Sequence, residues 1–284
     1  MRWLFLIGIF ASVLGMPHGA VAEVCRFAGT TDPAGRVAVI ATVTATNGAT
    51  RVVDVAATYD STTLFWFHIH YLVDEVSIWR SGDLDTVGVN TRYMIGSHII
   101  RQTWDLFHRD GDSMRGYRVQ AKSLADFGRR HPGFVQHWDP STFGQPWLDD
   151  YSAAPPERRA DLDLTSSSSS PRLLSPLALA FYWVRWLPQG GQDVSVFLPG
   201  FKADKVVDVP ITAGAWGGGT LWQTPVRYPV LSAAPPSTAT VWMSPDRHLL
   251  QLAMDLHEPR GSGRGVLTQV GCEGSPVMPE MAPR

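Results

Sequence analysis

The segment from Ser175 to Pro188, SPLALAFYWVRWLP, constrains the fold more than any other part of the chain. Its only charged residue is Arg185, and its apolar residues cover every side of a helical wheel. A helix that is apolar all round has to be surrounded by other elements. The run is also shorter than the roughly 20 residues that a membrane-spanning helix needs. We therefore predict a buried helix between Pro176 and Pro188, because proline suits a first helical turn and ends a helix.

The segments on both sides of this helix are typical of antiparallel strands. Asn47-Gly48 lies between two runs rich in β-branched residues and predicts a hairpin, and Asp110-Gly111 offers another turn. Gly261 to Gly265 is expected to turn the chain into its last strand. The strands are predicted at 36–45, 50–59, 64–72, 76–80, 86–90, 98–108, 114–122, 194–198, 205–211, 221–230, 250–257 and 266–270. The predicted fold is mainly β (α+β), a curved antiparallel sheet or half-barrel wrapped around one buried hydrophobic helix.

The amino terminus has the order of a secretory signal. A charged start is followed by an apolar run and then by small residues up to Ala22. We expect a signal peptide at 1–22, a single β-rich domain at 23–272 and a disordered tail at 273–284. Residues 126–171 are expected to form a long loop and a serine-rich excursion within that domain. The chain is thus predicted to be periplasmic or secreted, part of the cell envelope, and not membrane-spanning.

Cys25 and Cys272 are the only cysteines of the chain. In an oxidising compartment such a pair is expected to form a disulfide, and the alternative is two buried free thiols. The bridge would join the first strand to the last and close almost the whole chain.

The overall composition argues against nucleic acid as a partner. There are 24 basic and 26 acidic residues, so the chain has no basic footprint for nucleic acid or for an anionic membrane. Its 11 tryptophans and 12 phenylalanines are more aromatic surface than a small core requires. Part of that surface is expected to line a cavity.

Motifs for known catalytic chemistry are missing. The sequence has no G-x-S-x-G elbow and no S-x-x-K, and its GAWGGGT stretch lacks the lysine of a phosphate-binding loop. We therefore expect no cofactor. His68 and His70 have the spacing of some zinc ligands on a strand, but no H-E-x-x-H or C-x-x-C supplies a third ligand. Two histidines on the solvent side of the strand are the simpler interpretation, and no metal is predicted.

The long loop expected within residues 126–171 contains the best catalytic candidates, His131, His137 and Asp139. A histidine and a carboxylate can together act as a general base and the group that orients it. The alternative is a loop packed over the sheet by its own side chains. Arg185 also has two possible roles, as a snorkelling charge at the mouth of a cavity or as half of a buried ion pair.

The residues from Pro171 to Cys272 resemble a family. The helix PLALAFYWVRWLP with its arginine, and VWMSPDRHLLQLAMDLHEPRGSGRG with Trp242, Ser244 and Asp246 at a strand start, resemble the exported domains of unknown function of Gram-negative bacteria. In plan such proteins are similar to the lipoprotein carriers LolA and LolB, in which a curved sheet closes over helices and leaves an apolar cavity. The resemblance implies no enzymatic activity.

These observations lead to a first hypothesis and two alternatives. The first is a non-catalytic periplasmic binding or carrier protein for a hydrophobic ligand such as a lipid or an acyl chain. Its expected ligand-binding residues are Phe181, Trp183, Arg185 and Trp186 from the helix, with Trp138 and Trp147 from the loop. The alternatives are a periplasmic hydrolase that uses the loop histidines, and an envelope assembly factor that offers an exposed apolar patch to a protein partner.

Overall fold

The chain is mainly β, as predicted. The computed structural model describes residues 21–32, 35–45, 50–62, 68–121, 159–164, 173–186, 192–198, 205–211, 222–228, 237–244, 246–258 and 261–279. The helical residues form α3 (Pro176–Phe181) and the 3-10 helix η3 (Trp183–Trp186). The strands are β1 (Val21–Asp32), β2 (Gly35–Ala45), β3 (Thr50–Thr62), β4 (His68–Arg80), β5 (Asp83–Ile95), β6 (His98–Asp110), β7 (Ser113–Ala121), β8 (Arg159–Asp163), β9 (Leu173–Leu174), β10 (Gln192–Leu198), β11 (Lys205–Ile211), β12 (Trp222–Tyr228), β13 (Ser237–Met243), β14 (Leu249–Glu258) and β15 (Gly261–Glu273).

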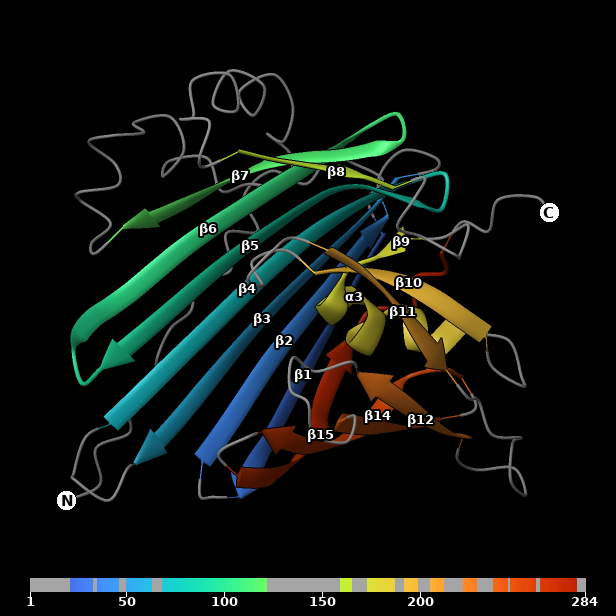
Figure 1. Ribbon diagram of the computed structural model, residues 1–284. Coiled ribbons are helices and arrows are strands. Elements are labelled where there is room, and N and C mark those ends of the chain that lie inside the picture. Colours follow the sequence, from blue (N-terminus) through green and yellow to red (C-terminus); the bar gives the residue numbers. More distant parts are fainter. Residues whose placement is uncertain are drawn as a thin grey trace.

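The described strands form one open sheet in the order β8-β7-β6-β5-β4-β3-β2-β1-β15-β14-β13-β12-β11-β10-β9. Neighbouring strands are antiparallel, except that β9 pairs with β10 in parallel. The sheet turns back on itself, so that β10, β11 and β12 pass in front of the strands around β1 (Figure 1) and β9 contacts β5. A sheet with so many twisted strands is expected to curl in this way.

The two halves of the sheet are joined where the first strand pairs with the last. β1 and β15 run antiparallel, and Cys25 lies directly opposite Cys272. These cysteines form the predicted disulfide, which links residues 247 positions apart in the sequence. In the chain-entropy model, closing so long a loop stabilises the folded state by about 5 kcal/mol. The disulfide therefore reinforces the junction between the halves.

The alternation along β2 divides the sheet into two faces. Val39, Ala41 and Val43 are buried, whereas the residues between them are more exposed. Val43 lies opposite Val53 of β3, which is also fully buried. We call the face that carries these side chains the inner face. β-branched residues suit such a pleated, half-buried surface, so local sequence and tertiary burial agree here.

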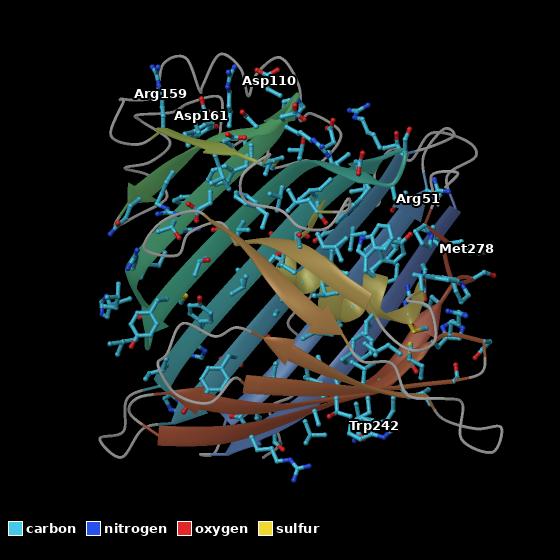
Figure 2. The ribbon with its side chains drawn as sticks, turned by 45° about the vertical axis from the view of Figure 1, so that its right-hand side comes forward. Arg51, Asp110, Arg159, Asp161, Trp242 and Met278 are labelled. Carbon is cyan, nitrogen blue, oxygen red and sulfur yellow. A yellow bond between two sulfur atoms is a disulfide. The ribbon has the colours of Figure 1, made fainter. Side chains whose placement is uncertain are left out.

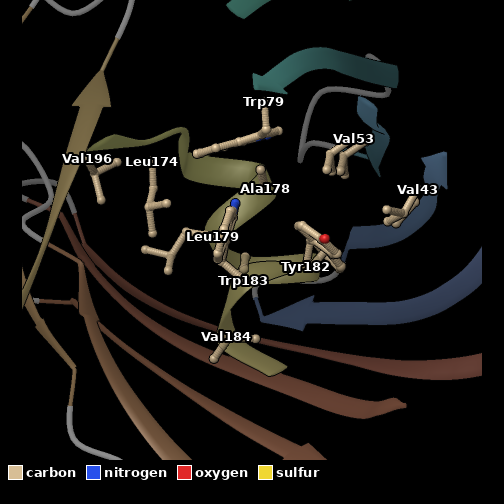
Figure 3. Close-up of a cluster of buried hydrophobic side chains, with 14 of the residues drawn as sticks. Val43, Val53, Trp79, Leu174, Ala178, Leu179, Tyr182, Trp183, Val184 and Val196 are labelled. Atoms are coloured by element: carbon tan, nitrogen blue, oxygen red, sulfur yellow. The ribbon is translucent and has the colours of Figure 1, made fainter. Parts of the chain in front are cut away.

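The apolar helix packs against the inner face. Residues Ala178 to Arg185 are all buried, as the sequence predicted for a helix that is apolar all round. Trp183 packs on Trp79 of β4 with their ring centroids 5.0 Å apart, and Phe181 packs on Phe27 of β1 at 5.4 Å. Figure 3 shows Tyr182 and Trp183 of the helical segment near Trp79, with Val43 of β2 and Val53 of β3 on the same side. The helical segment thus fills the space between the two parts of the sheet.

The start of α3 is capped by a carboxylate from the sheet. Glu75 of β4 accepts hydrogen bonds from the backbone N–H groups of Leu177, at 3.1 Å, and Ala178, at 3.0 Å. Burial raises the pKa of Glu75, and these two backbone hydrogen bonds oppose that effect. The first N–H groups of a helix have no acceptor inside the helix, and here the carboxylate of Glu75 is that acceptor.

The position of Glu75 also explains why the structure has one strand where the sequence predicted two. Strands were expected at 64–72 and 76–80, but β4 runs without interruption from His68 to Arg80. The acidic pair Asp74-Glu75 resembles a strand end in the sequence. Glu75 is tolerated inside the strand because its charge meets the amide groups of α3.

The last part of the chain also differs from the prediction. Gly261 to Gly265 belongs to β15 and pairs with β14, so these residues form part of a strand and not the expected turn. Residues 274–279, expected to be disordered, lie against the sheet, with Val277 buried. The Nε of Arg51 donates a 3.0 Å hydrogen bond to the carbonyl of Met278, and Figure 2 shows the two residues side by side. β8 lies within the predicted excursion at 126–171, most of which is outside the described residues.

We predict that Glu75→Ala destabilises the protein by about 2 kcal/mol, because the first N–H groups of α3 lose their acceptor. Glu75→Gln keeps an oxygen acceptor for these N–H groups and should cost much less. Urea unfolding followed by tryptophan fluorescence measures both. Equal losses for the two variants would show that the cap contributes little.

Candidate ligand-binding face

The helical residues predicted to bind a ligand lie mostly in the core. Phe181, Trp183 and Arg185 are buried, and Trp186 is half-buried. The other predicted site residues, namely Trp138, Trp147, His131, His137 and Asp139, lie outside the described residues. The first three therefore act as packed core side chains in the part of the chain that the structure describes.

Arg185 forms a buried ion pair with Glu23 of β1. Its Nη1 lies 2.5 Å from Oε1 of Glu23, and its Nη2 lies 2.9 Å from Oε2. Both side chains are almost fully buried, at 2% and 1% exposure. Oε2 of Glu23 also accepts a 3.3 Å hydrogen bond from the backbone N–H of Val277. Of the two roles that the sequence left open for Arg185, the buried ion pair is the one in the structure.

The family-like motif runs from a strand into a turn, because Trp242 belongs to β13. Ser244 and Asp246 follow the end of β13, whereas a strand start was expected. The backbone N–H of Ser244 bonds to the carbonyl of His248 at 2.9 Å, which closes the turn. Arg247 of this turn donates a 2.6 Å hydrogen bond to the carbonyl of Arg185 and stacks 5.5 Å from the ring centroid of Trp186. The helical part of the family-like pattern, with Arg185, and the part around Ser244 and Asp246 are thus in contact at the end of η3.

His68 and His70 lie at one end of β4. Their rings stack with centroids 6.4 Å apart, and His70 pairs with Asp60 of β3. His68 is exposed and His70 is half-buried. This position agrees with the interpretation of two histidines on the solvent side of a strand.

Beyond the helix, the inner face becomes steadily more exposed. Register pairing places successive rows of side chains across β3, β4 and β5. The first row is buried against α3, the second is half-buried and the third is partly open. These rows are Val55–Glu75–Val89, Ala57–Val73–Thr91 and Tyr59–Tyr71–Tyr93. The inner face is therefore open toward the far ends of β3 and β5, the arrowheads at the lower left of Figure 1.

The third row, which we call the tyrosine row, is the candidate site. It consists of Tyr59, Tyr71 and Tyr93, and Tyr71 is 40% exposed. Burial raises the pKa of Tyr71, while a hydrogen bond with Thr91 and the charge of Arg101 oppose that effect. The ring of Tyr71 is thus neutral at physiological pH and offers both an apolar surface and a hydroxyl group.

A cation and an apolar side chain border the tyrosine row. Arg101 of β6 lies opposite Tyr93 in the register and is exposed. Its neighbour Ile100, at a register shift between β5 and β6, is 49% exposed. Tyr71 and Ile100 are two of the few large hydrophobic side chains exposed among the described residues. The tyrosine row is therefore continued by a cationic side chain on β6, and an exposed aliphatic side chain precedes that cation in the sequence.

Sequence analysis singled out none of the three tyrosines as a site residue. A signal was present, because Tyr59 has the same strand parity as the buried Val53 and Val55. The three tyrosines come together only through pairing between strands, which a single sequence does not reveal.

The opposite face of the sheet carries a carboxyl pair. Asp54 of β3 and Asp74 of β4 share a hydrogen bond. Burial and the charge of Asp74 raise the pKa of Asp54 to about 7. Protonated Asp54 is then the donor and Asp74 the acceptor.

Comparison with known proteins gives a similar fold. No family model and no curated protein matches the chain. The solved structure of a β-barrel-like protein of domain of unknown function DUF1849 from Brucella abortus has a TM-score of 0.55 and 9% sequence identity, with 89% of this chain and 98% of that chain covered. The two proteins share a fold. This agrees with the expected mainly β domain of unknown function, and at such low identity the likeness concerns the fold alone. Within the described ranges, no helix is long and apolar enough to span a membrane.

We predict that Arg185→Met destabilises the protein by about 3–5 kcal/mol, because Glu23 would remain buried without a partner. Arg26→Met is the matched control, since Arg26 pairs with Glu273 on the surface, and it should cost less than about 1 kcal/mol. Urea unfolding at constant pH measures both. Similar losses would contradict a special role for the buried pair.

We also predict that Asp54 makes stability depend on pH. Its folded pKa of about 7 is above the ordinary 3.8, so folding takes up a proton between these values and the free energy of unfolding falls as pH rises through them. Asp54→Asn should therefore be more stable than wild type at pH 8, by up to about 4 kcal/mol, and the gain should vanish toward pH 4. Urea unfolding across this range is the measurement, with the exposed Asp112→Asn as a control. An unchanged pH slope in Asp54→Asn would refute the assignment.

Proposed function

We propose that this chain is an exported, non-catalytic binding or carrier protein for a hydrophobic ligand such as a lipid or an acyl chain. The ligand lies on the inner face beyond α3, against the tyrosine row. The observation that carries the proposal is the graded opening of this face, from fully buried rows beside the helix to Tyr71 at 40% exposure. Concave, aromatic-lined surfaces with few polar groups are the usual design for small apolar ligands.

The helix supports this function as a fixed wall. α3 is capped by Glu75, and η3 is tied to β1 through Glu23 and Arg185. In this proposal the curved sheet acts as a half-barrel around the helix, and the ligand takes the part of the inner face that the helix leaves open. The likeness in plan to the LolA and LolB carriers, expected from the sequence, belongs to the same proposal.

The half-exposed tyrosines explain why an apolar ligand would bind there. Each buries apolar ring area when a hydrocarbon chain covers it, at roughly 25 cal/mol per Å². Each hydroxyl group still finds water or a polar atom of the ligand at the edge. Arg101 beside the row favours a ligand with a neutral or anionic end.

Native mass spectrometry of the protein purified from periplasm tests this function. We expect reproducible extra mass that organic extraction removes and identifies as a lipid. Tyr71→Asp places a charge on the face and should lower lipid occupancy at least tenfold, about 1.4 kcal/mol. Replacing Trp183 or Arg185 is a poorer test, because both are core residues and the fold itself would suffer.

Val270→Asp is the matched control. Val270 is 71% exposed on β15, outside the tyrosine row, so its replacement should leave lipid occupancy unchanged. A clean apo mass for wild type under gentle conditions would contradict the carrier function. Equal loss in both variants would place any binding elsewhere.

A further inference from the structure

Two further side chains that can bind a metal lie beside the two cysteines of the disulfide. Glu23, Cys25, His248 and Cys272 each offer a ligand atom, and these four atoms all lie within 4.8 Å of one another. Sγ of Cys25 lies 3.5 Å from Oε1 of Glu23, and Nδ1 of His248 is also 3.5 Å from that oxygen. Cysteine sulfur, imidazole nitrogen and carboxylate oxygen are all ligand types that zinc binds, usually four at a time.

His248 is oriented as a ligand for this position. Its Nδ1 is buried and has no hydrogen-bond partner among the described residues. Its Nε2 lies 3.4 Å from Oδ2 of Asp246, which in turn bonds to the hydroxyl of Ser244. Histidines that bind a metal through one nitrogen usually donate the other N–H to a carboxylate. The turn from Ser244 to His248 therefore has the second contact that a metal-binding histidine requires.

The other ligands have supporting contacts as well. The amide nitrogen of Gln269 donates to Sγ of Cys272, and such a bond stabilises a thiolate. Glu23 is held by Arg185 and by the N–H of Val277. Its Oε1 accepts from Nη1 of Arg185 and also faces the sulfur of Cys25, so a second lone pair of this oxygen points toward the cysteines. Two thiolates, one carboxylate and Zn²⁺ sum to a charge of −1. The adjacent guanidinium of Arg185 neutralises that charge, so zinc adds no net buried charge.

We propose that the reduced protein binds one zinc ion through Cys25, Cys272, His248 and Glu23. The site exists only while both cysteines are thiols, because a disulfide sulfur has no thiolate charge to offer. A phosphine reductant and water supply the two electrons and two protons that convert the disulfide to two thiols, and the phosphine becomes its oxide. Zinc then displaces the two thiol protons. Tetrahedral zinc sets its ligands roughly 3.3–3.8 Å apart, so the two sulfurs separate and the other ligands move inward by about 1 Å.

In this proposal the metal and the disulfide are two alternative ways of linking β1 to β15. Both join β1 to β15, and zinc would additionally recruit the turn between β13 and β14 through His248. A reduced chain would thus have its first and last strands joined before any oxidation occurs. The inference is independent of the proposed ligand-binding function, since none of its residues belongs to the tyrosine row.

Equilibrium dialysis of the full chain against Zn²⁺, with and without phosphine, tests the site. We expect one zinc per reduced chain and none above background in the oxidised chain. Cobalt substitution should give intense tetrahedral d–d bands and a thiolate charge-transfer band. Cys25→Ser/Cys272→Ser should abolish binding, and His248→Ala should weaken it at least tenfold.

Asp246→Asn tests the orienting contact and should weaken zinc binding about 10- to 100-fold. His70→Ala is the matched control, because His70 also pairs with an aspartate but lies away from the cysteines, and its zinc affinity should equal that of wild type. Zinc retained equally in wild type and His248→Ala would mean that the thiols alone bind it, and this would overturn the proposal.

Folding of the reduced chain is followed by near-ultraviolet circular dichroism. If reduction unfolds the protein, zinc should restore the aromatic signal in wild type but not in His248→Ala. If the reduced chain stays folded, zinc should raise its urea midpoint. A reduced chain that neither binds zinc nor responds to it in either measurement would refute the site.

Discussion

The buried ion pair between Glu23 and Arg185 is the interaction on which the rest of the structure depends. It joins the first strand to the end of the apolar helix, and Val277 brings the C-terminal segment to the same carboxylate. Burying either charge alone would cost several kcal/mol, so the helix and β1 have to come together. With Glu75 holding the start of α3, the short helix is anchored at both ends, although a helix of this length has little stability of its own.

This anchoring separates the inner face into a closed part and an open part. Beside the helix, the side chains of the sheet are fully buried, and structural demands determine their identity. Farther along the same strands the rows open, and the tyrosine row lies where the side chains are only partly buried. Aromatic side chains on a partly open face are the feature that a ligand would explain. The carrier function that we propose rests on this exposure and position.

The junction of β1 with β15 concentrates the remaining chemistry of the described residues. The disulfide, the ion pair, His248 and the family-like turn all lie within this region. The first and last strands must meet there for the sheet to be continuous, so it is the part of the fold with the greatest separation in sequence. Covalent or metal closure has its largest effect at such a junction, because the entropy of the unfolded loop is greatest there.

The sequence by itself predicted the mainly β class, the hairpin between β6 and β7, the burial of the apolar segment and the pairing of Cys25 with Cys272, because alternation, turn residues and composition are local signals. It did not predict that the segment divides into α3 and η3. It also left two possible roles for Arg185, a charge at the mouth of a cavity or half of a buried ion pair. Only the tertiary structure decided between them, since the partner Glu23 lies 162 residues away. The continuity of β4 through Asp74-Glu75 was hidden for the same reason, because the amide groups that accommodate Glu75 come from α3. The tyrosine row depends on the register of three strands, and register is set by burial of one face over the whole sheet, which no single segment encodes.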